Sequence, residues 1–174
     1  MGLCKRLIAR LDIKGSKLIK GLQFEGVRVI GDPSLFATKY ASQNIDELVL
    51  DLRYNRGGLS YIASQVGYMV AGESSLGKVF LRYAFNEKHP IFDPVTGGLI
   101  SAWNFLSQTY GDPAVTGLSL NRPLPALDLS RVFILADRNT CSASELIING
   151  LRGIGVEVVL IGGGTCGKPY GGYY

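Results

Sequence analysis

Short apolar runs alternate with turn-forming residues along the chain, and this pattern predicts strands alternating with helices. Nearly continuous apolar runs at 47–53 and 131–137 are typical of strands buried on both faces of a parallel sheet, and 156–162 is expected to form a further strand. Helices are expected after the first two of these strands, at about 59–71 and 142–152. This order predicts an α/β fold with a mostly parallel sheet, flanking helices and right-handed crossovers.

The remaining segments carry weaker signals. Alternating apolar and polar residues predict further strands at 6–13, 17–24 and 79–84. The pair Asp32-Pro33 predicts the start of a helix that continues to about Ser42, because Asp caps helices and Pro fits the first turn. Segment 85–128 is rich in Pro and Gly, which predicts a long excursion with at most one helix, at about 98–109.

Composition places the chain among folded proteins. Its 174 residues are 47% hydrophobic and 18% charged, which suits one compact domain, or one and a fragment of another, and excludes a disordered tail. No run of about 18 apolar residues exists, so no membrane insertion is expected. The first 15 residues lack the apolar core of a secretory signal, and as written the sequence favours a cytoplasmic location.

Charge is distributed unevenly over the chain. Residues 1–40 hold eight basic and three acidic side chains, a net charge of +5, whereas the remaining 134 residues have a net charge of −1. The basic residues are diluted among alternating apolar positions, so nucleic-acid binding is not expected. The asymmetry instead indicates that two different pieces are joined, over about 1–40 and 41–174.

Three segments that follow predicted strands carry the candidate chemistry. They are the turn ending in Gly57 and Gly58, the helix start at Ser142 and Ala143, and the loop with Lys168. The carboxyl ends of parallel strands form a crevice, so these segments are expected to meet. A serine at a strand-to-helix junction is a candidate nucleophile, with the N–H groups of Ala143 and of the glycine turn as candidate oxyanion donors.

A serine nucleophile needs a base, and the sequence offers two candidates. The single histidine, His89, lies in the long excursion next to Pro90. Lys168 is the better candidate, because a lysine can act as the base when its surroundings leave the amine uncharged, and its neighbours contain no acid.

Each of these residues also has a purely structural interpretation. Ser142-x-x-Glu145 before an apolar run is a capping box, the two glycines form a turn, and Lys168 is then a surface lysine. Under this interpretation the chain is a non-catalytic α/β scaffold.

Nucleotide, metal and cofactor sites are not expected. Gly162-x-x-x-x-Gly167-Lys168 follows a strand and matches most of a phosphate-binding loop, but Pro169 stands where a Ser or Thr should hold magnesium. One histidine and scattered cysteines give no metal-ligand spacing.

ELVLDLRYNRGG, NTCSASELIINGLRG and TCGKPYG resemble, in this order, the C-terminal processing (tail-specific) serine peptidases, across about 41–174. The resemblance implies a crotonase/ClpP-like core that hydrolyses peptides or unfolded proteins, mostly in the periplasm or outside the cell. It implies Ser142 as nucleophile, Lys168 as base, and Ala143 with Gly57 and Gly58 as oxyanion hole.

Two departures from this family bear on activity. Some members place a glutamine four residues after the lysine, and that position is Gly172 here. The family's core continues with further strands beyond the lysine, and no peptide-binding PDZ domain is visible. The resemblance therefore implies a partial core, which leaves open whether the chain is active.

The first 40 residues resemble something else, the opening β-α-β of the imidazole glycerol phosphate synthase cyclase subunit, a (β/α)₈ barrel. In that resemblance Asp12 matches a catalytic aspartate, but a quarter of a barrel cannot close its sheet. We interpret the chain as a chimera joined near Tyr40–Ile45, whose first part supplies sheet neighbours to strand 47–53. A lesser alternative is a barrel fragment that binds a phosphate-sugar through Asp12 and Lys20.

Two further expectations concern covalent and non-covalent association. Cys141 and Cys166 stand close to Ser142 and Lys168 in sequence, so their sulfurs are expected near each other if serine and lysine approach; the reduced state is the default expectation, and an oxidising compartment would permit a disulfide. Open sheet edges predict self-association into a homo-oligomer.

Overall fold

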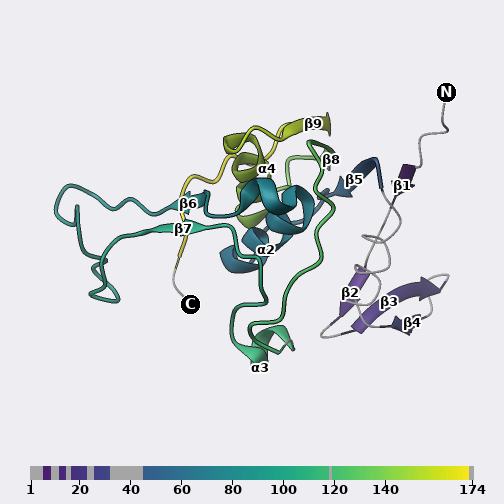
Figure 1. Cartoon of the computed structure of the whole chain (residues 1–174), viewed down its shortest axis with the longest axis horizontal. Coiled ribbons are helices and arrows are strands. Elements are labelled where there is room, and N and C mark those ends of the chain that lie inside the picture. The colour runs from purple at the N-terminus through teal and green to yellow at the C-terminus, as the bar shows by residue number, and fades with distance from the viewer. Residues whose placement is uncertain are drawn as a thin grey trace.

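The computed structural model describes residues 45–117 and 119–172 in full, together with the backbone of four strands before residue 45. Its main sheet has four strands, and every neighbouring pair is parallel (Figure 1). Their order is β1 (Arg6–Ile8), β5 (Glu47–Asp51), β8 (Arg131–Ala136) and β9 (Glu157–Gly162). This confirms the predicted α/β class with a mostly parallel sheet.

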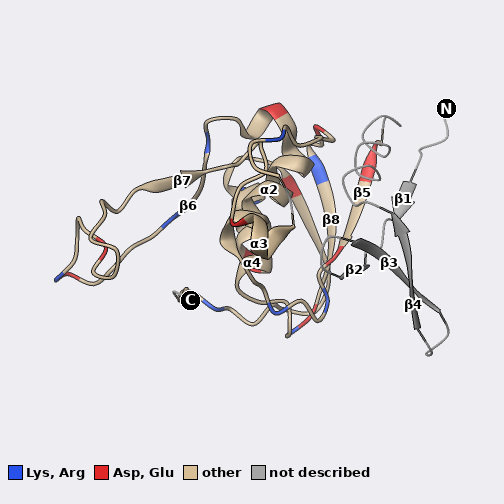
Figure 2. Ribbon diagram, turned by 90° about the horizontal axis from the view of Figure 1, so that it is seen from below, with Lys and Arg blue, Asp and Glu red and all other residues tan. Residues whose placement is uncertain are grey.

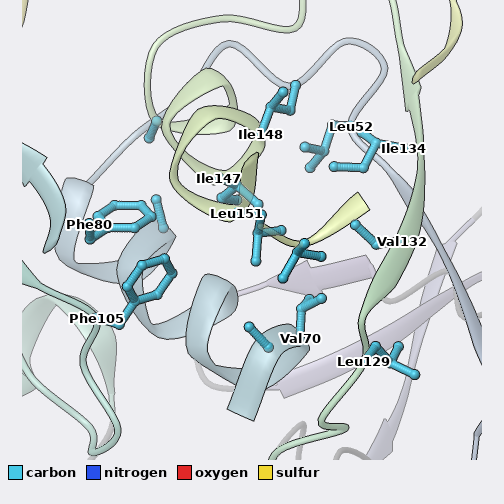
Figure 3. Packing of buried hydrophobic residues seen from close by; sticks show 14 residues of the cluster. Leu52, Val70, Phe80, Phe105, Leu129, Val132, Ile134, Ile147, Ile148 and Leu151 are labelled. Atoms are coloured by element: carbon cyan, nitrogen blue, oxygen red, sulfur yellow. The ribbon is translucent and has the colours of Figure 1, made fainter. Parts of the chain in front are cut away.

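Two helices flank this sheet, as predicted. Helix α2 (Ser60–Ala71) follows β5 and continues into a 3₁₀ turn, η1 (Gly72–Ser75). Helix α4 (Ala143–Gly153) follows β8 and packs against α2. In Figure 3 both helices lie beside β8, with the buried side chains between them and the strand.

The core is a single cluster shared by the helices and β8. Val132 and Ile134 point inward from alternate positions of β8 and are fully buried, as is Leu151 of α4 (Figure 3). Phe80 and Phe105 meet edge to face with ring centroids 5.0 Å apart. Each fully buried side chain of this size stabilises the fold by roughly 1.5–3 kcal/mol, so the cluster holds the sheet and helices in a fixed arrangement.

Strands before residue 45 differ from expectation. The segment 6–13 forms two strands in separate sheets, so the prediction of one strand was wrong. The first, β1, pairs with β5 in the register Leu7 to Leu48. The others form an antiparallel sheet of β2 (Asp12–Lys14), β3 (Lys17–Leu22) and β4 (Gly26–Gly31). The helix predicted to start at Asp32 lies outside the described residues.

A long arm, residues 79–104, follows α2 and η1 in the chain and precedes β8. Strands β6 (Val79–Arg82) and β7 (Ala102–Asn104) pair antiparallel, and the chain between them projects away from the helices (Figures 1 and 2). The helix predicted at about 98–109 is therefore wrong. Trp103 packs edge-on against Tyr83, 6.1 Å between ring centroids, and this cross-strand packing outweighs the local helical signal.

Two further observations complete the described part. A one-turn helix, α3 (Pro113–Thr116), is capped by Asp112, whose carboxylate accepts a hydrogen bond from the N–H of Ala114 at 2.8 Å. None of the helices described has the length and apolar character required to cross a bilayer. Basic and acidic residues are interspersed over this part of the molecule (Figure 2).

Candidate active site

The carboxyl ends of β5, β8 and β9 bring the three predicted segments together. The turn after β5 is joined to the turn after β8 by the Cys141 N–H, which donates to the Asn55 carbonyl at 3.0 Å. The segment after β9 is joined to the same turn by the Cys166 N–H, which donates to the Thr140 carbonyl at 3.0 Å. Backbone hydrogen bonds thus fix the relative positions of all three segments.

Ser142 occupies the junction between β8 and α4 in an uncommon backbone conformation. Its φ is 56° and its ψ −119°, although it is not a glycine. Four non-glycine residues have positive φ in the described part, and Tyr54 also lies in this site. The other two are Asn121 and Asp128, residue types that tolerate this region. Such strain costs about 1–3 kcal/mol and is typical of functional sites.

The glycine turn lies directly against Ser142. A Cβ placed on Gly57, whose φ is 97°, would come within 2.7 Å of the Ser142 Cβ and 2.8 Å of the Ala143 nitrogen. The Gly57 N–H donates to Asn55 Oδ1 at 2.9 Å. Within the described residues the N–H groups of Gly58 and Ala143 have no hydrogen-bond acceptor, and both residues line the groove described below.

Glu145, in the first turn of α4, is the centre of the polar contacts. One carboxylate oxygen accepts from the Ser142 N–H at 2.8 Å and from the Lys168 N–H at 3.0 Å. The other accepts from the Thr165 hydroxyl and the Gly167 N–H, both at 2.7 Å. In the sequence Glu145 is recognisable only as half of a capping box, because its contacts with the segment after β9 depend on the tertiary fold.

These contacts also set the ionisation of Glu145. Its side chain is buried, and desolvation alone would raise the pKa of the carboxyl. The hydrogen bonds from Thr165, Ser142, Gly167 and Lys168 outweigh this effect and lower the pKa. The group is therefore held as a carboxylate that ties the start of α4 to the loop after β9.

Lys168 is positioned through its backbone, whereas its side chain lies over an aromatic ring. The Nζ atom is 5.4 Å from the centroid of the Tyr170 ring, a cation–π arrangement. No hydrogen bond joins Nζ to the Ser142 hydroxyl in the described part of the chain. Both residues line the same groove.

A disulfide joins the two reactive segments. Cys141 is bonded to Cys166 across 25 positions in sequence, with Cα atoms 5.2 Å apart. The expected proximity of the two sulfurs is therefore present. These sulfurs and the Glu145 carboxylate lie within 4.8 Å of one another, but sulfurs bonded to each other offer no thiolate to a metal ion.

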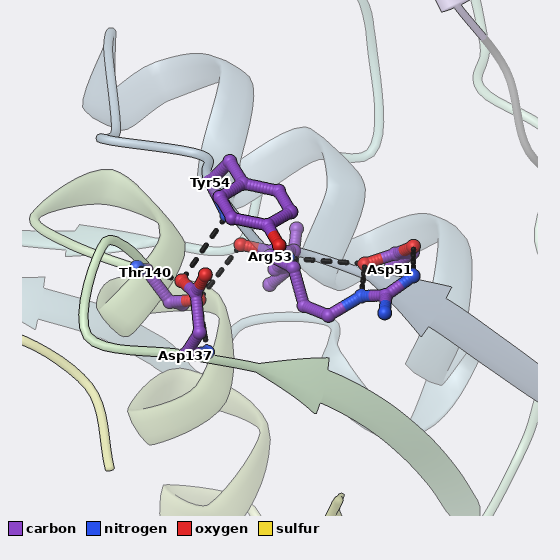
Figure 4. A network of polar contacts seen from close by, with 6 residues as sticks. Asp51, Arg53, Tyr54, Asp137 and Thr140 are labelled. Atoms are coloured by element: carbon purple, nitrogen blue, oxygen red, sulfur yellow. Dashed lines mark hydrogen bonds and ion pairs between the residues drawn. The ribbon is translucent and has the colours of Figure 1, made fainter. Parts of the chain in front are cut away.

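A second carboxylate, Asp137, joins the turn after β8 to the turn after β5 (Figure 4). Asp137 accepts from the N–H groups of Tyr54 at 3.1 Å and Asn139 at 2.9 Å, while the Thr140 hydroxyl donates to the Leu52 carbonyl at 2.7 Å. Desolvation opposes ionisation of Asp137, but backbone N–H donors outweigh it and lower its pKa. The turns after β5 and β8 thus form one hydrogen-bonded unit.

The neighbouring pair Asp51 and Arg53 orders the end of β5 (Figure 4). The guanidinium meets the carboxylate through two bonds, 3.0 Å from Nε and 2.7 Å from Nη2. This hydrogen bond and the charge of Asp51 raise the pKa of Arg53. The side chain of Arg53 is exposed, so the pair orients the chain more than it stabilises it.

A groove of about 400 Å³ begins at Ser142 and runs along the exposed face of α4 toward β6. Aliphatic and aromatic side chains form much of its lining, and two cations, Lys168 and Arg82, lie on it. Its apolar members are Leu59, Leu81, Leu146, Tyr61, Tyr83 and Tyr170. This lining fits an apolar side chain held next to the serine.

The remaining predicted site residues lie elsewhere or have no described side chain. His89 is exposed on the arm and does not line the groove. Asp12 is the first residue of β2 in the separate antiparallel sheet, and its side chain is outside the described residues, as is that of Lys20. Gly172 lines the groove.

Part of the chain is similar to imidazole glycerol phosphate synthase subunits. Imidazole glycerol phosphate synthase subunit HisF of Legionella pneumophila is 51% identical over 61 residues, which are 33% of this chain and 29% of that protein. The subunit of Myxococcus xanthus is 48% identical over 46 residues, 26% of this chain and 18% of that protein. The chain spans less than a third of these relatives, which agrees with two joined pieces.

The larger part of the chain matches a peptidase family. A crystal structure described as that of an S41 protease from Bacteroides fragilis NCTC 9343 matches with a TM-score of 0.57 and 27% identity, covering 78% of this chain and 30% of that one. The model of peptidase family S41 matches residues 31–171, which include β5, β8, β9 and the segments that meet at Ser142. The chain therefore belongs to peptidase family S41.

Proposed function

We propose that this chain carries a serine peptidase site in which Ser142 is the nucleophile and Lys168 the general base. The observation that supports this most directly is the Glu145 carboxylate, which accepts from the N–H of Ser142 at 2.8 Å and of Lys168 at 3.0 Å. One buried group thereby fixes the backbones of both residues. A capping role alone requires only the contact with Ser142.

The proposed reaction uses groups at the edge of the groove. Ser142 Oγ attacks the scissile carbonyl carbon while its proton passes to Lys168 Nζ, so the reacting molecules are those in which this amine carries no proton. The oxyanion receives hydrogen bonds from the N–H groups of Ala143 and Gly58. Lys168 then protonates the leaving amine, and water releases the acyl group from Ser142. Gly57 keeps its N–H on Asn55 and supports the turn.

The groove indicates which peptides fit. The groove that contains Ser142 is also lined by the apolar side chains of Leu59, Leu81 and Leu146. The substrate is therefore a peptide or unfolded protein with an apolar side chain near the cleaved bond. Apolar side chains reach such a seat only when the substrate chain is extended or unfolded, because folded proteins bury them.

Covalent labelling tests this proposal. A fluorophosphonate probe should add one adduct to the chain, detected by intact mass, and the adduct should map to Ser142. Ser142→Ala should remove it, whereas Ser101→Ala, a change at an exposed serine of the arm, should not. Lys168→Met should slow labelling about 10²-fold or more, in the range lost with a general base.

Failure to label would refute the proposed chemistry. An unlabelled protein with an intact circular dichroism spectrum would mean that the site residues serve as caps and turns, and the scaffold interpretation would replace the peptidase. In that case Ser142→Ala would change only stability, by about 1 kcal/mol.

A further inference from the structure

The disulfide links the two segments whose relative position the proposed reaction depends on. Cys141 directly precedes Ser142, and Cys166 lies two residues before Lys168. We propose that this disulfide is a positioning cross-link that fixes the segment carrying Lys168 relative to Ser142, so that the oxidised chain is the competent form and a dithiol reductant switches it off. This inference rests on the proposed Ser–Lys chemistry.

The two sulfurs differ in their surroundings. Cys141 is partly buried, and its backbone is fixed, because its N–H donates to Asn55 and its carbonyl accepts from the Ser144 N–H at 3.1 Å. Cys166 is exposed and lies in a segment without regular secondary structure. A thiolate in solution therefore reaches the sulfur of Cys166 more readily than that of Cys141.

Reduction by a dithiol then proceeds in two balanced steps. The reductant's thiolate attacks Cys166 Sγ, the bond to Cys141 breaks, and Cys141 leaves as a thiolate that takes a proton. The second thiol of the reductant attacks its own sulfur in the mixed disulfide and releases Cys166, which is also protonated. The cystine gains two electrons and two protons, and the dithiol becomes a disulfide.

The reduced site must rearrange. Bonded sulfurs lie about 2 Å apart in any disulfide, whereas non-bonded heavy atoms need roughly 3.5–4 Å. Since Cys141 is fixed at the start of α4, the Cys166 segment is the one that moves. Lys168 is two residues away, and a displacement of about 1 Å at a reacting group can cost about 10²-fold in rate.

The hydrogen bonds of Glu145 are expected to preserve the fold after reduction. After reduction Thr165 and Gly167 still hold the loop on α4 through this carboxylate, while the bond from the Lys168 N–H can lengthen as that residue shifts. The Cys166 sulfur lies 3.4 Å from Glu145 Oε2, a distance at which the thiol formed by reduction can also donate. Reduction is therefore expected to loosen the loop and shift the lysine without unfolding the core.

The test compares the full chain in both redox states. Fluorophosphonate labelling near pH 8 should fall about 10²-fold after treatment with dithiothreitol and recover on reoxidation. The difference in labelling rate between the oxidised and the reduced chain should narrow as pH rises, because hydroxide then replaces the lysine as base. Cys166→Ser should label at the reduced rate with or without the dithiol, and Cys4→Ser should respond like the parent chain.

Hydrogen exchange gives a readout that does not depend on activity. Peptides covering 163–172 should exchange faster after reduction, while those covering α4 should not change. Faster exchange without labelling in either state would support the cross-link and reject the peptidase. Equal labelling in both states, with three free thiols confirmed after reduction, would overturn the cross-link and leave the peptidase standing. Unchanged exchange would also overturn it.

Discussion

Replacing Glu145 by Gln tests whether one carboxylate holds the site together. The side chain accepts four hydrogen bonds of 2.7–3.0 Å from donors on two segments. An amide of the same shape keeps one acceptor oxygen and turns an NH₂ group toward the Gly167 N–H, where donor faces donor. Hydrogen bonds to charged groups contribute about 1.5–3 kcal/mol each, so we expect Glu145→Gln to destabilise the fold by about 3 kcal/mol.

Urea unfolding followed by far-UV circular dichroism measures this loss. For a chain of this length, 3 kcal/mol corresponds to a melting temperature lower by about 6–12 °C. Glu73→Gln, a change at an exposed glutamate, should cost less than about 0.5 kcal/mol. If Glu145→Gln is as mild as Glu73→Gln, the idea that this carboxylate joins α4 to the loop after β9 is refuted.

The pH dependence of the same variant gives an independent check. Hydrogen bonds lower the pKa of Glu145 below its ordinary value of 4.5, despite the opposing effect of burial. A depressed folded-state pKa contributes stability that is complete above the unfolded value and is lost as pH falls toward the folded one. The stability difference between the parent and Glu145→Gln should therefore narrow as pH falls below about 4.5.

Three further outcomes follow from the site. Gly57→Ala should destabilise the fold by about 2–3 kcal/mol and abolish fluorophosphonate labelling, because the added Cβ would lie 2.7 Å from the Cys141 carbonyl oxygen. Gly164→Ala, where the added Cβ would meet nothing within 4 Å, should do neither. Melting curves measure the stability and intact mass measures the labelling. Asp137→Asn should lower the urea midpoint at pH 7, and the deficit should shrink below about pH 3.8, since hydrogen bonds lower the pKa of this carboxyl. Reducing the Cys141–Cys166 bond should lower the free energy of unfolding by about 3 kcal/mol, the entropy of a loop spanning 25 positions, measured in urea with and without dithiol.

Much of the α/β core is predictable from sequence because its local signals agree with its packing. The strands β8 and β9 and the helices α2 and α4 lie within one residue of their predicted ranges. The alternate buried positions of β8 include Val132 and Ile134, whereas β9 leaves Leu160 and Ile161 exposed. The predicted meeting of Ser142, Gly57 and Lys168 followed from the rule that parallel strands present their carboxyl ends at one edge.

Other features depend on contacts between segments far apart in sequence. Trp103 lies in a strand because Tyr83 packs beside it across the β6–β7 pair, which no local pattern encodes. Glu145 was recognisable as a helix cap, but its hydrogen bonds to Gly167 and Lys168 required the position of β9. The hydrogen bond that the Gly57 N–H donates to Asn55 Oδ1 likewise depends on the backbone path of the turn, which the sequence does not reveal.

The pairing of β1 with β5 bears on how such a chain can arise. The parallel ladder from Arg6–Glu47 to Ile8–Val49 is made by main-chain groups that every non-proline residue carries. An exposed strand edge is therefore a generic acceptor for an unrelated extended segment. Recombination between genes can join a foreign strand to a peptidase sheet at such an edge without first matching side chains, and later substitutions can refine the packing.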